Sequence, residues 1–284
     1  MQHVEFFDID HFENNYHRVK PPASLSHFID FFWQTKFDHL WKKYPKGFSD
    51  ALFPNIGYTY LVNLGTPFIM QVDEKRTKMK TDGFLPRHQS IECHHQPGNV
   101  LFGIKFKISP VIFQKKVNFS EYKDSIFPLS YLMDKNILDR LKGTINFQER
   151  VDILVTYFSS LVKAVDGSPR PVSIVSQILD ACDRNNNFTI SIEALAQEHN
   201  ISSRTLQRYF ETTTSLSSKK TLQILRVRKA VAEIANDPKN FDLRKFGYYD
   251  YSHFYKHLKQ FLDKRTITKI KPYLSVLSLL RKRV

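Results

Sequence analysis

Apolar residues along this chain repeat with two different periods, and the change from one to the other occurs near residue 125. Between about residues 50 and 120, apolar and polar positions alternate, most clearly at 58–64 and 100–108, between breaks rich in Gly, Pro and Asn. Alternation of this kind is typical of strands that bury one face. We therefore predict strands in these two ranges, with residues 71–87 as a polar connection or a hairpin between them.

Helical periods dominate on both sides of this strand-rich stretch. Ser24 follows Pro21-Pro22 and is a suitable N-cap for a helix whose apolar face would comprise Leu25, Phe28, Ile29, Phe32 and Trp33. A second apolar stripe runs along residues 147–165. Such a stripe must be covered, either by the rest of the first domain or by a second copy of the chain. We favour packing within the chain.

Charge separates the two parts further. The chain has 42 Lys and Arg residues against 28 Asp and Glu residues, a formal net charge of +14. Residues 168–284 hold 21 of the basic residues but only 10 of the acidic ones. A basic excess confined to one region predicts a polyanionic partner for that region. The breaker-rich segment 166–171 coincides with this shift, so we place the domain boundary there and divide the chain into residues 1–166 and 167–284.

Cysteine content and apolar run lengths bear on the compartment. The two cysteines, Cys93 and Cys182, are too few for a disulfide framework, and no secretory segment opens the chain. Its apolar runs are far shorter than the roughly 20 residues of a membrane helix. We therefore expect a cytoplasmic protein without a membrane partner.

The basic region contains the pattern of a helix-turn-helix. Ser191 can cap a helix that buries Leu195 and Ala196, His199-Asn200 can form a turn, and Ser202 can cap a second helix. In that second helix Leu206, Tyr209 and Phe210 should lie inward. The open face would then carry Ser203, Arg204, Gln207, Arg208 and Glu211. Arg and Gln side chains match base edges in the major groove of double-stranded DNA, which makes this helix a candidate reader.

A second candidate reader follows a long helix. Residues 216–236 have a continuous helical pattern, and Gly247 then supplies a turn before a further helix capped by Asp250. This last helix should bury Phe254, Leu258 and Phe261. Its exposed face would carry Tyr251, Ser252, Tyr255, Lys256 and Lys259. The bland alternative for either unit alone is a helical hairpin with solvated charges, but two such units joined by one long helix favour DNA binding.

The combined pattern resembles the AraC/XylS family of bacterial transcription regulators. The matching segments are residues 201–210, 226–230 and 247–254. This resemblance implies an all-α DNA-binding domain with two helix-turn-helix units joined by a long helix. The residues before Trp33, the Phe53-Pro54-Asn55 segment and residues 102–106 likewise resemble the sensor-like domain attached to some family members. We therefore expect a strand-rich α+β N-terminal domain, for which a small barrel is one arrangement, and an all-α C-terminal domain.

The resemblance also assigns positions. It places the base-facing residues of the first unit at Arg204, Gln207 and Arg208, and those of the second at Tyr251, Ser252, Tyr255 and Lys256; Ser203 lies on the same open face. Asp242-Leu243 stand where the family has an apolar residue and a small alanine, so we expect the first helix of the second unit to be reduced or missing. For phosphate contacts we predict Lys219, Lys220, Arg226, Arg228 and Lys259.

One segment of the N-terminal region invites a zinc interpretation. Residues 88–95 contain His88, Glu92, Cys93, His94 and His95. On a strand, however, Cys93 and His95 share one face while the others share the opposite face, so a single site would need a bulge or remote ligands. The chain also has neither a Gly-x-Ser-x-Gly turn nor a phosphate-binding glycine loop. We expect no metal, no cofactor and no catalytic residues.

The sequence therefore predicts a DNA-binding transcriptional regulator and no enzyme. Its partners would be double-stranded DNA, with RNA polymerase, a small-molecule effector and a second copy of the chain as open candidates. Two rivals remain at this point: an enzyme, DNA-directed or metal-dependent, targeted by the helix-turn-helix, and a protein-interaction module with degenerate helices.

Overall fold

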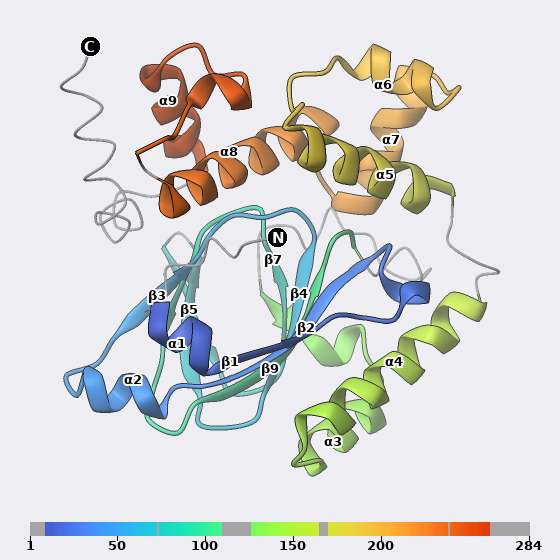
Figure 1. Cartoon of the computed structure of the whole chain (residues 1–284). Helices are drawn as coiled ribbons and strands as arrows, with labels where there is room; N and C mark the ends of the chain where they lie inside the picture. Colours follow the sequence, from blue (N-terminus) through green and yellow to red (C-terminus); the bar gives the residue numbers. More distant parts are fainter. Residues whose placement is uncertain (1–8, 73, 110–125, 165–169, 238, 262–284) are drawn as a thin grey trace.

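The computed structural model describes residues 9–72, 74–109, 126–164, 170–237 and 239–261 (Figure 1). Two antiparallel sheets make up most of the N-terminal region, and helices make up the C-terminal region, as the sequence predicts. In the part of the chain that is described, the outer strands of each sheet do not pair with one another. The α+β class is thus confirmed, but the sheets form an open sandwich rather than a closed barrel.

The larger sheet has six strands and the smaller has four. In spatial order the larger sheet contains β1 (Tyr16–Val19), β2 (Ile29–Lys36), β9 (Val100–Phe106), β4 (Tyr58–Asn63), β7 (Gly83–Pro86) and β10 (Phe127–Pro128). The smaller sheet contains β3 (Ser49–Leu52), β8 (Ile91–His94), β5 (Phe68–Val72) and β6 (Lys75–Met79). The predicted strands at 58–64 and 100–108 are β4 and β9. The predicted polar connection holds the β5–β6 hairpin and then β7.

The predicted helix after Ser24 is wrong. A short 3-10 turn, η1 (Ala23–Leu25), leads directly into β2, whose pairing with β1 and β9 leaves it in the interior of the sheet. Its two faces are both buried: Phe32 packs on one side of the sheet, and Phe31 and Trp33 pack on the other. A strand that is apolar on both faces has no alternation, so its spacing imitates a helical stripe.

These two faces belong to two hydrophobic cores. The core between the sheets includes Phe31, Trp33, Phe68, Met70 and Leu85. Its close packing requires a glycine on β9, because a Cβ on Gly103 would lie 2.6 Å from the Trp33 ring. The other core covers the opposite face of the large sheet and continues into the C-terminal helices.

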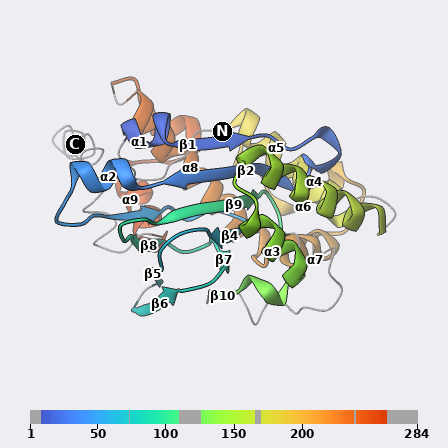
Figure 2. The ribbon, with the colours of Figure 1, turned by 90° about the horizontal axis from the view of Figure 1, so that it is seen from below.

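Helices of the N-terminal region lie around this sandwich (Figures 1 and 2). They are α1 (Ile9–Asn14), α2 (Asp38–Lys43), α3 (Lys135–Gly143) and α4 (Phe147–Ala164), with the 3-10 turn η4 (Leu129–Tyr131) before α3. The predicted stripe at 147–165 is α4, and its Phe158 packs against the rings of Phe28 and Phe106. The chain itself therefore covers this stripe, as favoured from the sequence.

The C-terminal helices lie across one end of the sandwich (Figure 1). They are α5 (Arg170–Asn185), α6 (Ile192–Glu198), α7 (Ser203–Thr214), α8 (Ser218–Asn236), the 3-10 turn η5 (Leu243–Phe246) and α9 (Tyr251–Phe261). The predicted boundary between residues 166 and 167 lies outside the described residues. Among the helices that are described, none combines the length and the apolar character needed to cross a membrane.

Hydrogen bonds connect the two regions at specific points. The Tyr58 hydroxyl donates to the Ser215 hydroxyl at 2.7 Å, and the Ser109 amide donates to the Thr213 carbonyl at 2.6 Å. On α5, the Ser176 hydroxyl donates to the carbonyl of His27 at 2.7 Å. Since Thr213 and Ser215 lie at the end of α7, the sandwich holds the last turn of this helix directly.

Candidate nucleic-acid interface

The first unit is formed by α6, a tight turn and α7. The Ser191 hydroxyl accepts a hydrogen bond from the Ala194 amide, and the Ser202 hydroxyl accepts one from the Thr205 amide, so both helices have the predicted serine caps. Asn200 has a φ of 53°, in the left-handed region that ends α6. Leu206 and Phe210 are fully buried. The caps and the apolar spacing that the sequence predicts are therefore both present in this unit.

The exposed face of α7 carries two arginines. Arg204 and Arg208 are exposed and lie one turn apart, whereas Ser203 beside them is half-buried. Neither arginine forms an ion pair with a carboxylate in the described part of the chain. Their guanidinium groups are thus available to an external anion or base edge.

Gln207 is held by the protein on both sides of its amide. Its Nε2 donates to Glu211 Oε1 at 2.7 Å, and its Oε1 accepts from the Ser218 hydroxyl at 2.6 Å. The bond to Ser218 ties α7 to the first residue of α8, and the bond to Glu211 lies within α7. A base contact by Gln207 would have to replace them, which gives this residue a second role in positioning α7.

Arg226 does not lie where the sequence analysis placed it. The prediction made it a phosphate contact, but the side chain is only 8% exposed and its Nε donates to the Phe246 carbonyl at 2.6 Å. A terminal nitrogen donates to the Gly247 carbonyl, and the guanidinium lies 3.8 Å from the centre of the Tyr248 ring. Arg226 is therefore an internal anchor, because its charge is satisfied inside the protein.

Arg228 is also internal. It is 5% exposed, and its NH1 donates to the carbonyls of Phe53 at 3.2 Å and Pro54 at 2.8 Å. The predicted phosphate contact is thus replaced by a contact between α8 and the segment that follows β3. Both corrections have one cause: three faces of α8 are covered, by the first unit, the second unit and the sandwich.

The second unit differs from the first in its leading helix. As predicted from Asp242-Leu243, this helix is reduced, here to the four residues of η5. Gly247 ends it with a φ of 71°, and a Cβ at this position would lie 2.7 Å from the Thr189 methyl. Asp250 Oδ1 then accepts from the His253 amide at 2.7 Å and caps α9. The short turn is held by Arg226 instead of by a full helix.

The face that α9 exposes is less rich in forked donors. Ser252 and Lys256 are exposed, whereas Tyr251 and Tyr255 are half-buried and pack against the core. Phe254, Leu258 and Phe261 are buried, as predicted. One ammonium group and one hydroxyl are thus the fully exposed polar groups among the predicted base-facing residues of this helix.

The remaining predicted phosphate contacts lie at or near the surface. Lys219 and Lys259 are exposed, and Lys259 Nζ lies 4.7 Å from the centre of the Tyr255 ring. Lys220 is half-buried, with its Nζ 4.1 Å from the centre of the Phe261 ring. Burial lowers the pKa of Lys220 from its ordinary value. Lys219 and Lys259 are therefore the freer cations of the three.

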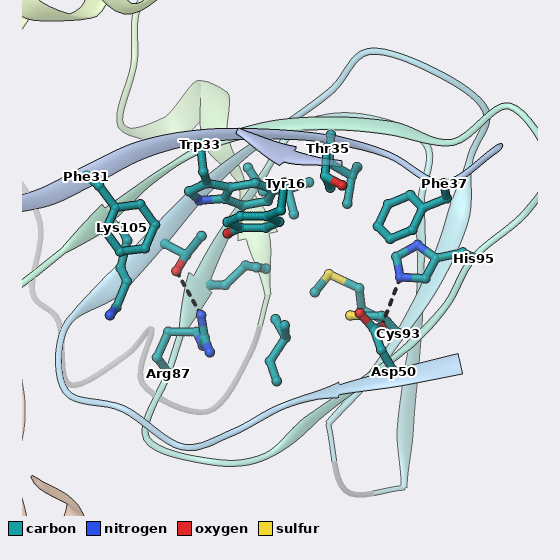
Figure 3. Close-up of a pocket in the computed structure, with 16 residues that line it drawn as sticks. Tyr16, Phe31, Trp33, Thr35, Phe37, Asp50, Arg87, Cys93, His95 and Lys105 are labelled. Atoms are coloured by element: carbon teal, nitrogen blue, oxygen red, sulfur yellow. Dashed lines mark hydrogen bonds and ion pairs between the residues drawn. The ribbon is translucent and has the colours of Figure 1, made fainter. Parts of the chain in front are cut away.

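A cavity of about 30 Å³ lies between the two sheets of the N-terminal region (Figure 3). Lys105 and Arg87 lie toward one end of it, and Asp50, Cys93 and His95 lie toward the other. Lys105 is paired with Asp30 at 2.8 Å, and Arg87 donates to Thr59 at 3.2 Å and to the Phe53 carbonyl at 3.1 Å. Both cationic side chains are therefore bonded to groups of the protein itself.

The other end of the cavity bears on the metal question. As predicted, Cys93 and His95 point to the buried side, while Glu92 and His94 on the opposite side are half-buried. Asp50 on β3 is a candidate remote ligand that the sequence could not identify, and its carboxylate, the Cys93 thiol and the His95 ring have one donor atom each within 4.8 Å of the others. The strand-face separation is thus no longer a reason to expect no metal.

Comparison with known proteins gives structural neighbours only. No protein-family model matches the chain, and the search of curated proteins finds no relative. ToxT from Vibrio cholerae, in a structure at 1.65 Å resolution, is 9% identical with a TM-score of 0.44, covering 90% of this chain and 98% of that one. ToxT with a bound unsaturated fatty acid is 10% identical with a TM-score of 0.43, covering 87% and 90%.

A further neighbour is the AraC-like transcriptional activator CuxR, with 14% identity, a TM-score of 0.30 and coverage of 79% of this chain and 89% of that one. At such identities and scores the matches do not bear on function, so function has to be inferred from the side chains of this chain.

The sequence prediction missed one candidate site residue, Asp50, and misplaced two others, Arg226 and Arg228. Asp50 has no motif, and only the pairing of β3 with β8 places it opposite Cys93. Arg226 had a usable signal, because it lies among apolar residues in the middle of a long helix, where an arginine is buried more often than at an edge. Burial of Arg228, in contrast, depends on the sandwich and had no local signal.

Proposed function

We propose that this chain is a sequence-specific regulator of transcription, of the AraC/XylS type, that binds double-stranded DNA. The observation that carries the proposal is the exposed pair Arg204 and Arg208 on a capped helix at one end of α8. A second capped helix, exposing Ser252 and Lys256, lies at the other end of α8 (Figure 1). Two candidate readers on one rigid connector are typical of a two-site DNA binder.

Base readout in this proposal is concentrated on α7. Arginine donates in a fixed fork that matches the O6 and N7 acceptors of guanine, and such a contact contributes about 1–3 kcal/mol of discrimination. Ser203, Arg204, Gln207 and Arg208 are the proposed readers in the first unit. Tyr251, Ser252, Tyr255 and Lys256 are the proposed base-facing residues in the second, where Lys256 can bind phosphate as well as a base.

The length of α8 fits this arrangement. Its 19 residues span about 28 Å at 1.5 Å per residue. Successive major-groove segments on one face of a duplex are about 34 Å apart. Units at the two ends of α8 can therefore reach neighbouring groove segments, with Lys219, Lys220 and Lys259 contributing salt-dependent phosphate contacts. Arg226 and Arg228 have no part in this proposal.

The N-terminal region supplies sensing or assembly in the proposed regulator. Its direct hydrogen bonds to the end of α7 and to α8 give it a physical means of affecting the DNA-binding helices. A small-molecule effector, a second copy of the chain and RNA polymerase are the proposed further partners. DNA affinity and sedimentation of the full chain, with and without added ligands, test the first two.

The proposal is tested by selecting bound duplexes from a random library with the full chain and measuring binding by fluorescence anisotropy. We expect a defined site. Arg204→Ala should lose about 1–3 kcal/mol of discrimination at one or two base pairs, with little change on random DNA. Gln207→Ala should lose discrimination and also some stability, because it removes the link to Ser218.

Matched variants separate the contacts. Lys219→Ala should weaken binding to every sequence and make the log–log salt slope shallower by about one. Arg140→Ala, an exposed arginine on α3, should change neither quantity. If no sequence is enriched, or if Arg204→Ala weakens specific and random DNA equally, DNA readout by α7 is refuted. Binding of a protein in place of DNA would favour an interaction module with degenerate helices, and turnover of a substrate would favour the enzyme alternative.

A further inference from the structure

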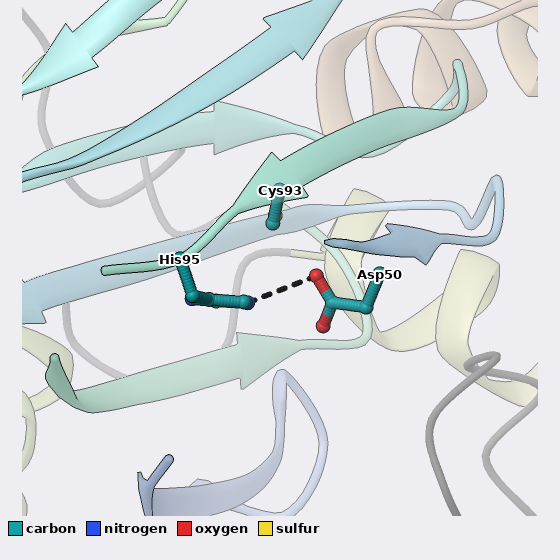
Figure 4. A group of neighbouring side chains, drawn as sticks. All are labelled: Asp50, Cys93 and His95. Carbon is teal, nitrogen blue, oxygen red and sulfur yellow. Dashed lines mark hydrogen bonds and ion pairs between the residues drawn. The ribbon is translucent and has the colours of Figure 1, made fainter. Parts of the chain in front are cut away.

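The pairing of β3 with β8 brings three metal-binding side chains together inside the sandwich. In the antiparallel register Asp50 lies directly opposite Cys93, where side chains on one face are about 4.5–5.5 Å apart at Cβ. His95 lies two residues beyond Cys93 and so on the same face. Within the described residues this is the one place where three His, Cys, Asp or Glu donors lie this close together (Figure 4).

The His95 ring is oriented as a metal ligand usually is. Asn99 Nδ2 donates to the Thr66 carbonyl at 3.1 Å, so the Asn99 oxygen faces His95 Nδ1, 2.7 Å away, and accepts a hydrogen bond from its N–H. Rings of Phe37 and Phe68 stack on the imidazole, with centres 3.7 and 5.5 Å away. Metal-bound histidines commonly donate their second nitrogen to such an oxygen. His95 Nε2 is thereby directed at Asp50.

The Asp50 carboxylate is incompletely satisfied without a further partner. Its side chain is buried, with only 3% of the residue exposed, and Oδ1 lies 2.9 Å from His95 Nε2. Its second oxygen, Oδ2, is buried and has no hydrogen-bond partner. A buried carboxylate oxygen in this condition is unfavourable, because nothing compensates for its loss of hydration. A protonated His95 would pair with Asp50 Oδ1, but Oδ2 would still have no hydrogen-bond partner.

We propose that Asp50, Cys93 and His95 form a binding site for one divalent transition-metal ion. One nitrogen, one oxygen and one sulfur donor suit a borderline ion such as Zn²⁺ or Co²⁺, whereas Mg²⁺ and Ca²⁺ prefer oxygen ligands. Ligand atoms around a tetrahedral zinc ion lie about 3.3 Å apart or more. Binding therefore requires the carboxylate and the imidazole to separate by several tenths of an ångström.

The fourth position of such an ion would face the cavity between the sheets (Figure 3). A cavity of about 30 Å³ has room for a bound water but not for a substrate. The site is therefore a structural or regulatory one, and it does not support the metal-dependent enzyme alternative. The ion would also tie β3 to β8 three residues before Phe53, whose carbonyl accepts from Arg228 of α8.

Metal binding is tested on the full chain, stripped with a chelator, reduced and titrated with Co²⁺ or Zn²⁺. We expect one ion per chain and, with Co²⁺, a near-ultraviolet thiolate charge-transfer band. Cys93→Ser should remove this band, whereas Cys182→Ser, which changes a buried cysteine of α5, should retain it. Asn99→Ala leaves all three ligands in place and should weaken binding roughly 10–100-fold. Circular dichroism establishes that each variant is folded.

Two results would overturn the site: a folded wild-type chain that binds much less than one ion, or a charge-transfer band that survives in Cys93→Ser. If Cys93→Ser does not fold, the metal affinities of Asp50→Asn and Asn99→Ala are measured instead. Metal affinity that is unchanged in both variants refutes the site. These measurements need no DNA, so they are independent of the proposed function. An effect of Zn²⁺ on DNA affinity rests on that function and is measured separately.

Discussion

The two helix-turn-helix units hold their second helices in different ways. In the first unit a seven-residue helix, α6, packs against α7, and serine side chains cap both. In the second unit the leading helix is only four residues long, and Arg226 of α8 holds the backbone at Phe246 and Gly247. A buried guanidinium that donates to two carbonyls can thus replace the packing of a missing helix.

The exposed faces of α7 and α9 also differ. The first unit exposes two arginines, whose forked donors discriminate between base edges, whereas the second exposes Lys256 and keeps its tyrosines half-buried. We infer that the first unit reads sequence and that the second mainly anchors the protein on phosphates. Four predictions test this contrast, from the largest expected effect to the smallest.

Phe254→Ala should have the largest effect. Phe254 lies on the buried face of α9, next to Phe241 and Tyr248, and its truncation should cost about 3–5 kcal/mol of unfolding free energy. Because η5 is so short, amides of the second unit should lose hydrogen-exchange protection while those of α6 and α7 keep it. Loss of protection in both units together would show that they fold as one body.

Arg226→Met tests the anchor. Hydrogen bonds to charged groups contribute about 1.5–3 kcal/mol each, so this variant should destabilise the second unit by several kcal/mol in urea unfolding. Lys229→Met, which removes a half-buried cation from the same helix, is the matched control and should cost less. If Arg226→Met instead keeps its stability and shows a shallower salt slope on DNA, Arg226 contacts phosphate as the sequence analysis expected.

Lys256→Ala should lower DNA affinity a few-fold on all sequences and leave base preference almost unchanged. The reason is that an ammonium group binds phosphate as a point charge without a fixed fork. A base-substitution scan of the selected site, with wild type and with this variant, measures the effect. A half-site under α9 that is as selective as the one under Arg204, and that Lys256→Ala relaxes, would make both helices readers.

At neutral pH, the contribution of His257 to stability should be the smallest of these effects. Burial, His253 and the cations Arg226, Lys256 and Lys220 lower the pKa of His257 from its ordinary 6.5 to about 4. In the unfolded chain His257 is protonated below about pH 6.5, whereas in the folded chain it stays neutral until about pH 4. Folding stability is therefore lost as the pH falls from 6.5 to 4. His257→Gln should flatten this slope in thermal unfolding. An unchanged slope in His257→Gln would contradict the shifted pKa.

Neighbouring residues along the chain were enough to predict the first unit and the strands β4 and β9, whereas the reduced leading helix of the second unit was expected from the resemblance to the AraC/XylS family. Serine caps, apolar spacing and turn residues act within a few positions, so their physics is local. The exposure of Arg204 and Arg208 follows from the same helical period that buries Leu206 and Phe210. The charge excess of the C-terminal part is likewise a property of composition alone.

Contacts between distant segments decided the rest. Residues 29–36 became a strand because β1 and β9 cover its edges and two cores cover its faces, which no local period records. Arg228 is internal because the carbonyls of Phe53 and Pro54 lie against α8, more than 170 residues away in sequence. Asp50 meets Cys93 and His95 only through the register of β3 with β8. These contacts depend on tertiary packing, because the local sequence is compatible with many partners for each side chain and only the folded structure brings one of them close.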